Sequence, residues 1–201
     1  MESEARRTAP PEVRKRQILD AARSCFIRDG FAATKVSDVA ETAGVSVGLV
    51  YRYFSDKAAL MTAIVAEEAR HQFNELVDPA QHLCTGAHLT TDELVSALQR
   101  TLHDRNRVLL MLEVTTAVMR DEDLRRTAVT IQLDQANALA ERLAPVMDCE
   151  FGVEELGVRL QALAGLAAGL AIQIAVAPDT EAAVIRLFQR SANAILSDRV
   201  T

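Results

Sequence analysis

Apolar residues recur every three or four positions along most of this 201-residue chain. That spacing places them on one face of an α-helix, whereas strands would show strict alternation. Glycine and proline stops, together with serine, threonine and aspartate starts, divide the pattern into segments. The predicted helices number about nine and span approximately residues 11–29, 34–43, 46–54, 55–77, 91–105, 107–120, 121–143, 153–176 and 178–197. We therefore expect an all-α fold.

Composition agrees with this assignment and indicates the cellular setting. Apolar residues make up 49% of the chain, and only 8 Gly and 5 Pro interrupt it. The longest apolar stretch, residues 162–172, is shorter than the ~20 residues of a membrane-spanning helix, so no membrane partner is expected. Cys25, Cys84 and Cys149 show neither paired zinc spacing nor a disulfide framework. The N-terminus is charged where a signal peptide is apolar. We expect a cytoplasmic protein.

Charge is distributed unevenly along the chain. The formal net charge is -6, which by itself disfavours a polyanionic partner. Residues 1–57, however, hold ten Lys or Arg and eight Asp or Glu and so carry +2, which leaves -8 for the remaining residues. This asymmetry predicts a basic, anion-facing N-terminal part joined to an acidic body.

The segment from Thr34 to Phe54 has the features of a helix-turn-helix. Gly44 supplies the backbone freedom for a sharp turn between two short helices, and Ser46 is placed to cap the second one. The small side chain of Ala40 permits close approach of the two helices. Four valines are expected to form the apolar cluster between them: Val36, Val39, Val45 and Val50. The second helix would then enter the major groove of DNA, with its amide-rich start facing a phosphate.

The exposed face of this second helix and its flanks supply the candidate DNA contacts. Arg52 can pair with a guanine, and Val47 or Leu49 can pack against a thymine methyl group. Gly48 allows close backbone approach, and hydroxyl or ammonium groups on the flanks suit phosphates. The predicted DNA-binding residues are Thr34, Lys35, Ser46, Val47, Gly48, Leu49, Tyr51, Arg52, Tyr53 and Lys57.

An ordinary helical hairpin is the alternative interpretation of this segment. In that case Gly44 is only a helix C-cap and the aromatic residues belong to the core. Val50 and Phe54 fit a core position in either interpretation. The hairpin leaves an exposed polar set without a shared purpose, so the pattern favours DNA binding. These residues are Tyr51, Arg52, Tyr53 and Lys57.

The run from about Arg14 to Ile64 resembles the N-terminal domain of TetR/AcrR-family transcriptional regulators. The matching residues are Ile18-Leu19-Asp20-Ala21-Ala22, Gly30-Phe31, Thr34, Val39-Ala40, Ala43-Gly44-Val45-Ser46, Gly48, Tyr51-Arg52-Tyr53-Phe54 and Lys57-Ala58-Ala59-Leu60. The resemblance implies a homodimer, a palindromic double-stranded DNA operator, and release of that DNA when a small-molecule effector binds the C-terminal part. One departure is Val47, where many members of the family carry Lys or another polar residue.

We expect three regions: a flexible tail over residues 1–11, a helix-turn-helix DNA-binding domain over 12–57, and a ligand-binding and dimerisation domain over 58–201. Small residues recur at helical spacing within 153–176, which suits close helix packing either between subunits or within one. The candidate dimer-interface residues are Gly165, Ala168, Gly169, Ile172, Val184, Ile185, Phe188 and Ile195. The candidate effector-pocket residues, each of which can also be an ordinary core or surface residue, are Phe73, His103, Leu109, Met111, Glu113, Met119, Arg120, Gln161 and Gln173.

Other functions fit the sequence less well than a ligand-responsive repressor. An enzyme is disfavoured, because the chain has no glycine-rich phosphate loop, nucleophile elbow or metal-ligand spacing. We expect no catalytic residue, no metal site and no cofactor. A redox response through Cys25 or Cys84 would modify the regulator without replacing it. Activation instead of repression would leave the same signals in the sequence.

Overall fold

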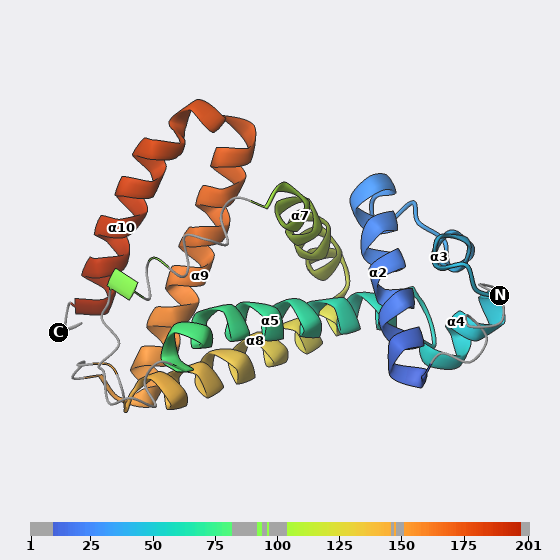
Figure 1. The fold of residues 1–201 in the computed structure, drawn as a ribbon, viewed down its shortest axis with the longest axis horizontal. Coiled ribbons are helices and arrows are strands. Elements are labelled where there is room, and N and C mark those ends of the chain that lie inside the picture. Colours follow the sequence, from blue (N-terminus) through green and yellow to red (C-terminus); the bar gives the residue numbers. More distant parts are fainter. Residues whose placement is uncertain are drawn as a thin grey trace. The chain divides into compact units, whose positions relative to one another are not determined.

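The computed structural model describes residues 10–81, 92, 93, 96, 104–145, 147 and 151–197, with the backbone alone for 71–81 and Ser197. These residues form an all-α fold, as predicted, and contain no β-strand (Figure 1). The helices are α2 (Pro11–Asp29), α3 (Val36–Ala43), α4 (Val47–Tyr53), α5 (Lys57–Gln81), α7 (Arg105–Arg120), α8 (Glu122–Leu143), α9 (Val153–Val176) and α10 (Glu181–Ser197), with a 3-10 turn over Pro178–Thr180. Most of the helix predicted over 91–105 and all of the tail up to residue 9 lie outside the described residues.

The chain divides into two compact units. The first unit contains Met1–Glu67 and Leu109–Ala128, and the second contains Glu68–Val108 and Val129–Thr201. Helices α5, α7 and α8 therefore each contribute residues to both units. The predicted functional domains, 12–57 and 58–201, remain a proposal, because compactness alone does not assign a function to either part.

The first unit is built on the apolar face of α2, which packs against α3, while α3 packs against α4. The residues on this face recur every three or four positions, as an amphipathic helix requires. The fully or nearly fully buried side chains of these helices and of the start of α5 are Ile18, Leu19, Ala22, Cys25, Phe26, Val39, Ala40, Val50, Leu60, Met61 and Ile64. Val36 and Val45, predicted to share this core, are half-buried.

Two glycines set the ends of the first helices. Gly30 ends α2 with φ 83°, and Gly44 ends α3 with φ 63° in the left-handed region. An L side chain is strained at such φ values, whereas glycine is not. Both stops were predicted. Ser46 then caps α4, since its hydroxyl accepts a hydrogen bond from the Leu49 N–H at 3.2 Å. Asp56 does the same for α5, through the Ala59 N–H at 2.8 Å.

Two predicted helix ends differ from the structure. The helix predicted over 34–43 begins instead at Val36, and the Asp38 carboxylate accepts the N–H of Lys35 at 2.8 Å. The helix predicted over 55–77 continues through Pro79 to Gln81. Proline has a φ that suits a helix and lacks only its own N–H, so a helix can pass through it at some cost in stability.

The second unit is centred on the pair α9 and α10, which pack directly against each other. Their shared core contains Leu156, Leu160, Leu163, Ala167, Leu170, Ala171, Ile174, Val184, Phe188, Ala192 and Leu196, together with Leu139, Ala140 and Leu143 of α8. Arg159 is a buried cation of this unit. Its guanidinium donates to the Ile195 carbonyl near the end of α10 and to the Glu155 carboxylate at 2.7 Å, and it lies 3.8 Å from the centroid of the Phe151 ring.

Within the described part of the chain, α9 is the one helix long and apolar enough to cross a membrane by length and composition. Its most apolar window has a mean hydropathy of 1.5, so the expectation based on residues 162–172 alone underestimated this helix. In the folded chain 39% of that window is buried. Its buried side chains belong to the core shared with α10, which is typical of the central helix of a globular unit.

Two glycine replacements should affect stability in opposite directions. At Gly44 the φ of 63° makes Ala unfavourable by about 1 to 2 kcal/mol, although an added Cβ would meet no atom within 4 Å. At Gly48, inside α4 and equally open, Ala should raise the free energy of unfolding by roughly 0.5 to 1 kcal/mol. Urea unfolding of Gly44→Ala and Gly48→Ala, followed by circular dichroism, measures both. Equal effects of the two changes would contradict the assigned backbone conformations.

Candidate nucleic-acid interface

Helix α4 has one face in the core of the first unit and the other in solvent. Val50 is fully buried, and Phe54, directly after the helix, is 5% exposed. On the part of the helix that faces solvent, Val47 is 40% exposed and Tyr51 is 52% exposed. These exposed positions are four residues apart, so they lie above one another on the helix. The helix is therefore held from one side, and its other side is available to a partner.

Most of the predicted DNA-binding residues lie on this open face or beside it. Ser46, Val47, Gly48, Tyr51 and Arg52 are exposed, and Leu49 and Tyr53 are half-buried. Lys35 is also exposed, at the start of α3. An added Cβ at Gly48 would meet nothing within 4 Å, so the backbone itself is reachable at that position. The interface combines one guanidinium, one ammonium, three hydroxyls and a small apolar surface.

Thr34 does not lie on this surface, contrary to the prediction. Its side chain is 2% exposed, and its hydroxyl donates to the Gly30 carbonyl at 2.8 Å. The hydroxyl also lies 3.3 Å from the Cys25 carbonyl. A buried hydroxyl that closes a loop in this way stabilises the connection between α2 and α3 and cannot reach a phosphate.

Lys57 is also engaged inside the first unit. Its ammonium donates to the carbonyls of Phe31, Ala32 and Thr34 at 2.6, 3.1 and 3.0 Å, which uses all three of its N–H donors. It lies 4.5 Å from the centroid of the Phe31 ring, a cation–π contact. Partial burial lowers the pKa of the Lys57 ammonium. The prediction that this group contacts a phosphate is therefore replaced by an internal structural role.

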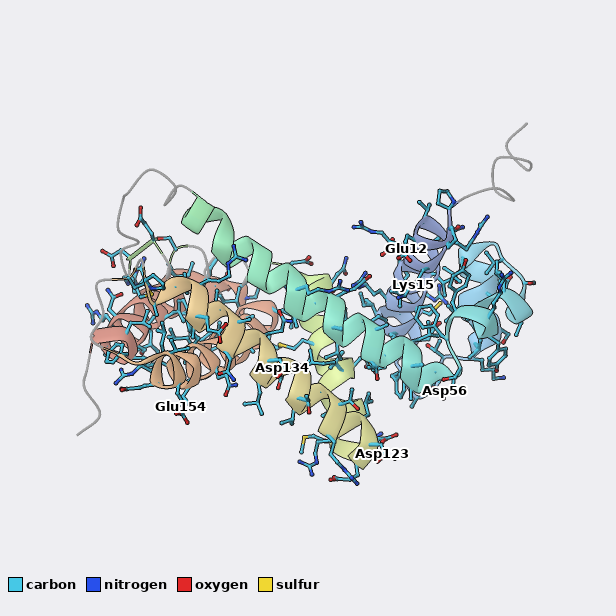
Figure 2. The ribbon with its side chains drawn as sticks, turned by 90° about the horizontal axis from the view of Figure 1, so that it is seen from below. Glu12, Lys15, Asp56, Asp123, Asp134 and Glu154 are labelled. Atoms are coloured by element: carbon cyan, nitrogen blue, oxygen red, sulfur yellow. The ribbon has the colours of Figure 1, made fainter. Side chains whose placement is uncertain are left out.

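Two polar residues of α2 were not singled out from the sequence. The Gln17 side-chain amide donates to the Ala43 carbonyl at 2.6 Å and so ties α2 to the end of α3, next to the Gly44 turn. Lys15 is an exposed cation on the early turns of α2, and Figure 2 shows it there beside Glu12. The same view places Asp56 where the chain leaves α4 and enters α5. The sequence shows that such side chains are polar, but it does not identify their partners.

Several of the candidate effector-pocket residues are exposed or contact another segment of their own unit. Met119 is 79% exposed, and Arg120 and Gln173 are also exposed. Glu113 hydrogen-bonds to the backbone of Phe31 at 2.8 Å. Leu109, Met111 and Gln161 are half-buried. The Phe73 side chain and His103 lie outside the described residues.

The candidate dimer-interface residues separate into two groups. Val184 is 5% exposed and Phe188 is 0% exposed, because both pack in the core between α9 and α10, so neither can contact another subunit directly. Gly165 and Gly169 lie on the other side of α9, where an added Cβ would meet nothing within 4 Å. Ala168, Ile172, Ile185 and Ile195 are half-buried.

Comparison with known proteins shows what the first unit is similar to. Residues 18–64 match the sequence profile of the bacterial regulatory proteins of the tetR family. The chain is 39% identical over 57 residues to the HTH-type transcriptional repressor AcnR of Corynebacterium diphtheriae, over 28% of this chain and 30% of AcnR. It is 30% identical over 131 residues to the HTH-type transcriptional repressor KstR of Rhodococcus jostii, over 65% of this chain and 57% of KstR. The chain thus spans between about a third and three fifths of the length of these two relatives.

A solved structure agrees over nearly the whole chain. A protein from Mesorhizobium loti, described as a TetR-family transcriptional regulator, superposes with a TM-score of 0.70 and 21% identity, over 94% of this chain and 97% of that one. At this identity the agreement concerns the fold. The profile match falls within α2 to α5, the helices that form the candidate interface, so this part of the chain is similar to the bacterial regulatory proteins of the tetR family.

Proposed function

We propose that this protein is a transcriptional repressor that binds a palindromic DNA operator as a homodimer and releases it when a small molecule binds. The observation that carries the proposal is the two-sided environment of α4. Burial of Val50 and Phe54 fixes the rotation of the helix, and this turns Val47, Tyr51 and Arg52 toward solvent. A short helix presented in this way suits the major groove.

The open face divides by chemistry into reading and positioning contacts. Arg52 is the group suited to a guanine, and Val47 is the group suited to a thymine methyl. Tyr51, Tyr53, Ser46 and Lys35 supply hydroxyl or ammonium donors for phosphates, which fix the protein on the duplex without reading sequence. With Thr34 and Lys57 internal, the proposed surface is smaller and less cationic than the sequence alone indicated.

Homodimerisation is proposed through the outer face of α9. Its exposed or half-buried positions follow each other at intervals of four, three, four, three and four residues: Val158, Ala162, Gly165, Gly169, Ile172 and Val176. This is the spacing of a seam along which two helices pack, and small residues let their backbones approach. Val158 is 62% exposed and Val176 is 80% exposed, so burial between subunits would remove apolar surface from water. Leu187 of α10, at 57% exposed, is a further exposed apolar side chain of the second unit.

A dimer also explains how a small interface becomes specific. Two copies of α4 must lie about 34 to 36 Å apart to enter successive major grooves on one side of the duplex. An effector that binds more tightly to a dimer with a different α4 separation would lower the affinity for the operator. The reduction cannot exceed the ratio of the effector's affinities for the two dimer arrangements. Effector release is proposed from the resemblance to the TetR family, and the residues that line the effector site stay a prediction.

Replacing single residues on α4 should separate reading from positioning. Arg52→Ala should reduce discrimination between an operator, selected from random duplexes with the intact protein, and a scrambled duplex. Tyr51→Ala should weaken binding to both duplexes by a similar factor. Fluorescence anisotropy titrations give the dissociation constant of each variant, relative to the wild type, for each of the two duplexes. If both variants bind both duplexes like the wild type, α4 is not the DNA-contacting helix.

The two lysines near the interface form a matched pair. Lys35→Ala, at an exposed position, should reduce the slope of log affinity against log salt by about one and leave stability nearly unchanged. Lys57→Ala should keep that slope but lower the free energy of unfolding by about 1 to 3 kcal/mol, since three carbonyls lose a charged donor. Salt titrations and urea unfolding of both variants provide the comparison. If Lys57→Ala instead reduces the salt slope and leaves stability unchanged, Lys57 contacts a phosphate.

A large side chain on the α9 seam should separate the subunits. In one protomer Gly169→Leu meets open space, so the fold should persist, but a close helix partner would clash. Light scattering should therefore report a monomer for Gly169→Leu and a dimer for Gln132→Leu, a control change at an exposed position of α8. A stable Gly169→Leu dimer with unchanged dissociation constant would place the interface elsewhere.

A further inference from the structure

A carboxylate from α7 reaches the connection between α2 and α3. Glu113 Oε2 accepts a hydrogen bond from the backbone N–H of Phe31 at 2.8 Å, across 82 positions in the sequence. Phe31 directly follows Gly30, where α2 ends, so its N–H points away from the helix and takes a partner from elsewhere. Hydrogen bonds to an ionised carboxylate are stronger than those between neutral groups. This one joins α7 to the segment that leads into the helix-turn-helix.

The carboxylate lies directly beside Gly30. An added Cβ at Gly30 would lie 3.4 Å from Glu113 Oε2 and 3.7 Å from Oε1, which are ordinary van der Waals distances. Gly30 is therefore favoured for its φ of 83°, which turns the chain toward Phe31, and not for the space beside Glu113.

Phe31 is also held from the opposite side of the connection. Its carbonyl accepts the Lys57 ammonium at 2.6 Å, and its ring packs edge-on against Phe26 with centroids 5.2 Å apart. The Thr34 hydroxyl closes the connection on the Gly30 carbonyl. Lys57 is the first residue of α5, three positions after Phe54. Phe31 is thus fixed by groups from α5 and α7 at once, beside the start of α3.

We propose that Glu113 is a positioning residue for DNA binding: its hydrogen bond to Phe31 couples α7 to the helix-turn-helix and holds α3 and α4 in the arrangement that binds DNA. A displacement of α7 would then break the bond, increase the range of positions open to α3 and α4, and lower operator affinity by lowering the fraction of competent molecules. The inference rests on the proposed function. It assigns Glu113 to regulation of DNA binding in place of a contact with the effector.

Three variants test this coupling. Glu113→Ala removes the acceptor, Glu113→Gln keeps an amide oxygen that can accept from Phe31, and Glu141→Ala removes an equal charge at an exposed position of α8. Each full-length variant is titrated with the duplex selected by the wild type. Hydrogen–deuterium exchange is then measured for peptides covering 27–35 and 105–120, in the free protein and at saturating duplex.

Glu113→Ala should bind the duplex about tenfold more weakly, whereas Glu113→Gln should stay within about threefold of the wild type and Glu141→Ala should be unchanged. In the wild type and in Glu113→Gln, duplex binding should slow exchange in 105–120, and this difference should be lost in Glu113→Ala even at saturation. A variant that is only less stable would instead exchange faster in both the free and the duplex-bound protein. The slowing of exchange in 105–120 on duplex binding would then remain.

Two outcomes overturn the inference, and a third overturns its basis. Wild-type affinity of Glu113→Ala, or an intact exchange difference in 105–120 of that variant, would show that Glu113 does not couple α7 to DNA binding. If the wild type selects no duplex at all, the proposed function itself fails. That result is distinguishable, because it appears before any variant is made.

Discussion

Burial of Val50 and Phe54 is the constraint on which the proposed DNA interface depends. Helix α4 has only seven residues, fewer than an isolated helix needs to be stable in water. Its shape therefore comes from its neighbours: the core that covers Val50, the left-handed turn at Gly44 and the Ser46 cap. Because these three features fix the rotation of α4, they also decide that Val47, Tyr51 and Arg52 face solvent.

The surroundings of α4 are held by polar contacts that face inward. Lys57 and Thr34 both donate hydrogen bonds to backbone carbonyls between residues 30 and 34. Glu113 accepts the backbone N–H of Phe31 in the same segment. Since an unpaired buried backbone group is costly, each of these side chains is tied to the conformation of the connection. The segment between α2 and α3 is thus a structural part of the site, although none of its contacts faces a partner.

Periodicity and end signals were sufficient for most of the fold. They predicted α8, α9 and the stops at Gly30 and Gly44, because helix amphipathicity and left-handed backbone positions are local properties of the sequence. They also predicted that Val50 is buried. Periodicity was insufficient wherever a residue's partner lies far along the chain. Lys57 and Thr34 are polar residues beside a DNA-binding motif, and only the fold shows that their donors are already used.

The same limit applies to α10. Phe188 and Val184 lie on an apolar face, and periodicity identifies such a face without stating whether it meets the same chain or another one. The structure places both in the core of one protomer. The outer seam of α9 has smaller residues and a weaker hydrophobic signal, so it is distinguished from the core face only when both faces are seen together.

The central claim is that the open face of α4 is the surface that touches DNA. Site-specific photocross-linking tests it directly, with p-benzoylphenylalanine in place of Tyr51 on α4 or in place of Leu133, an exposed residue of α8. Each full-length protein is irradiated with the duplex that it binds best. We expect DNA adducts from position 51 and none from position 133. Adducts from position 133 alone would contradict the account.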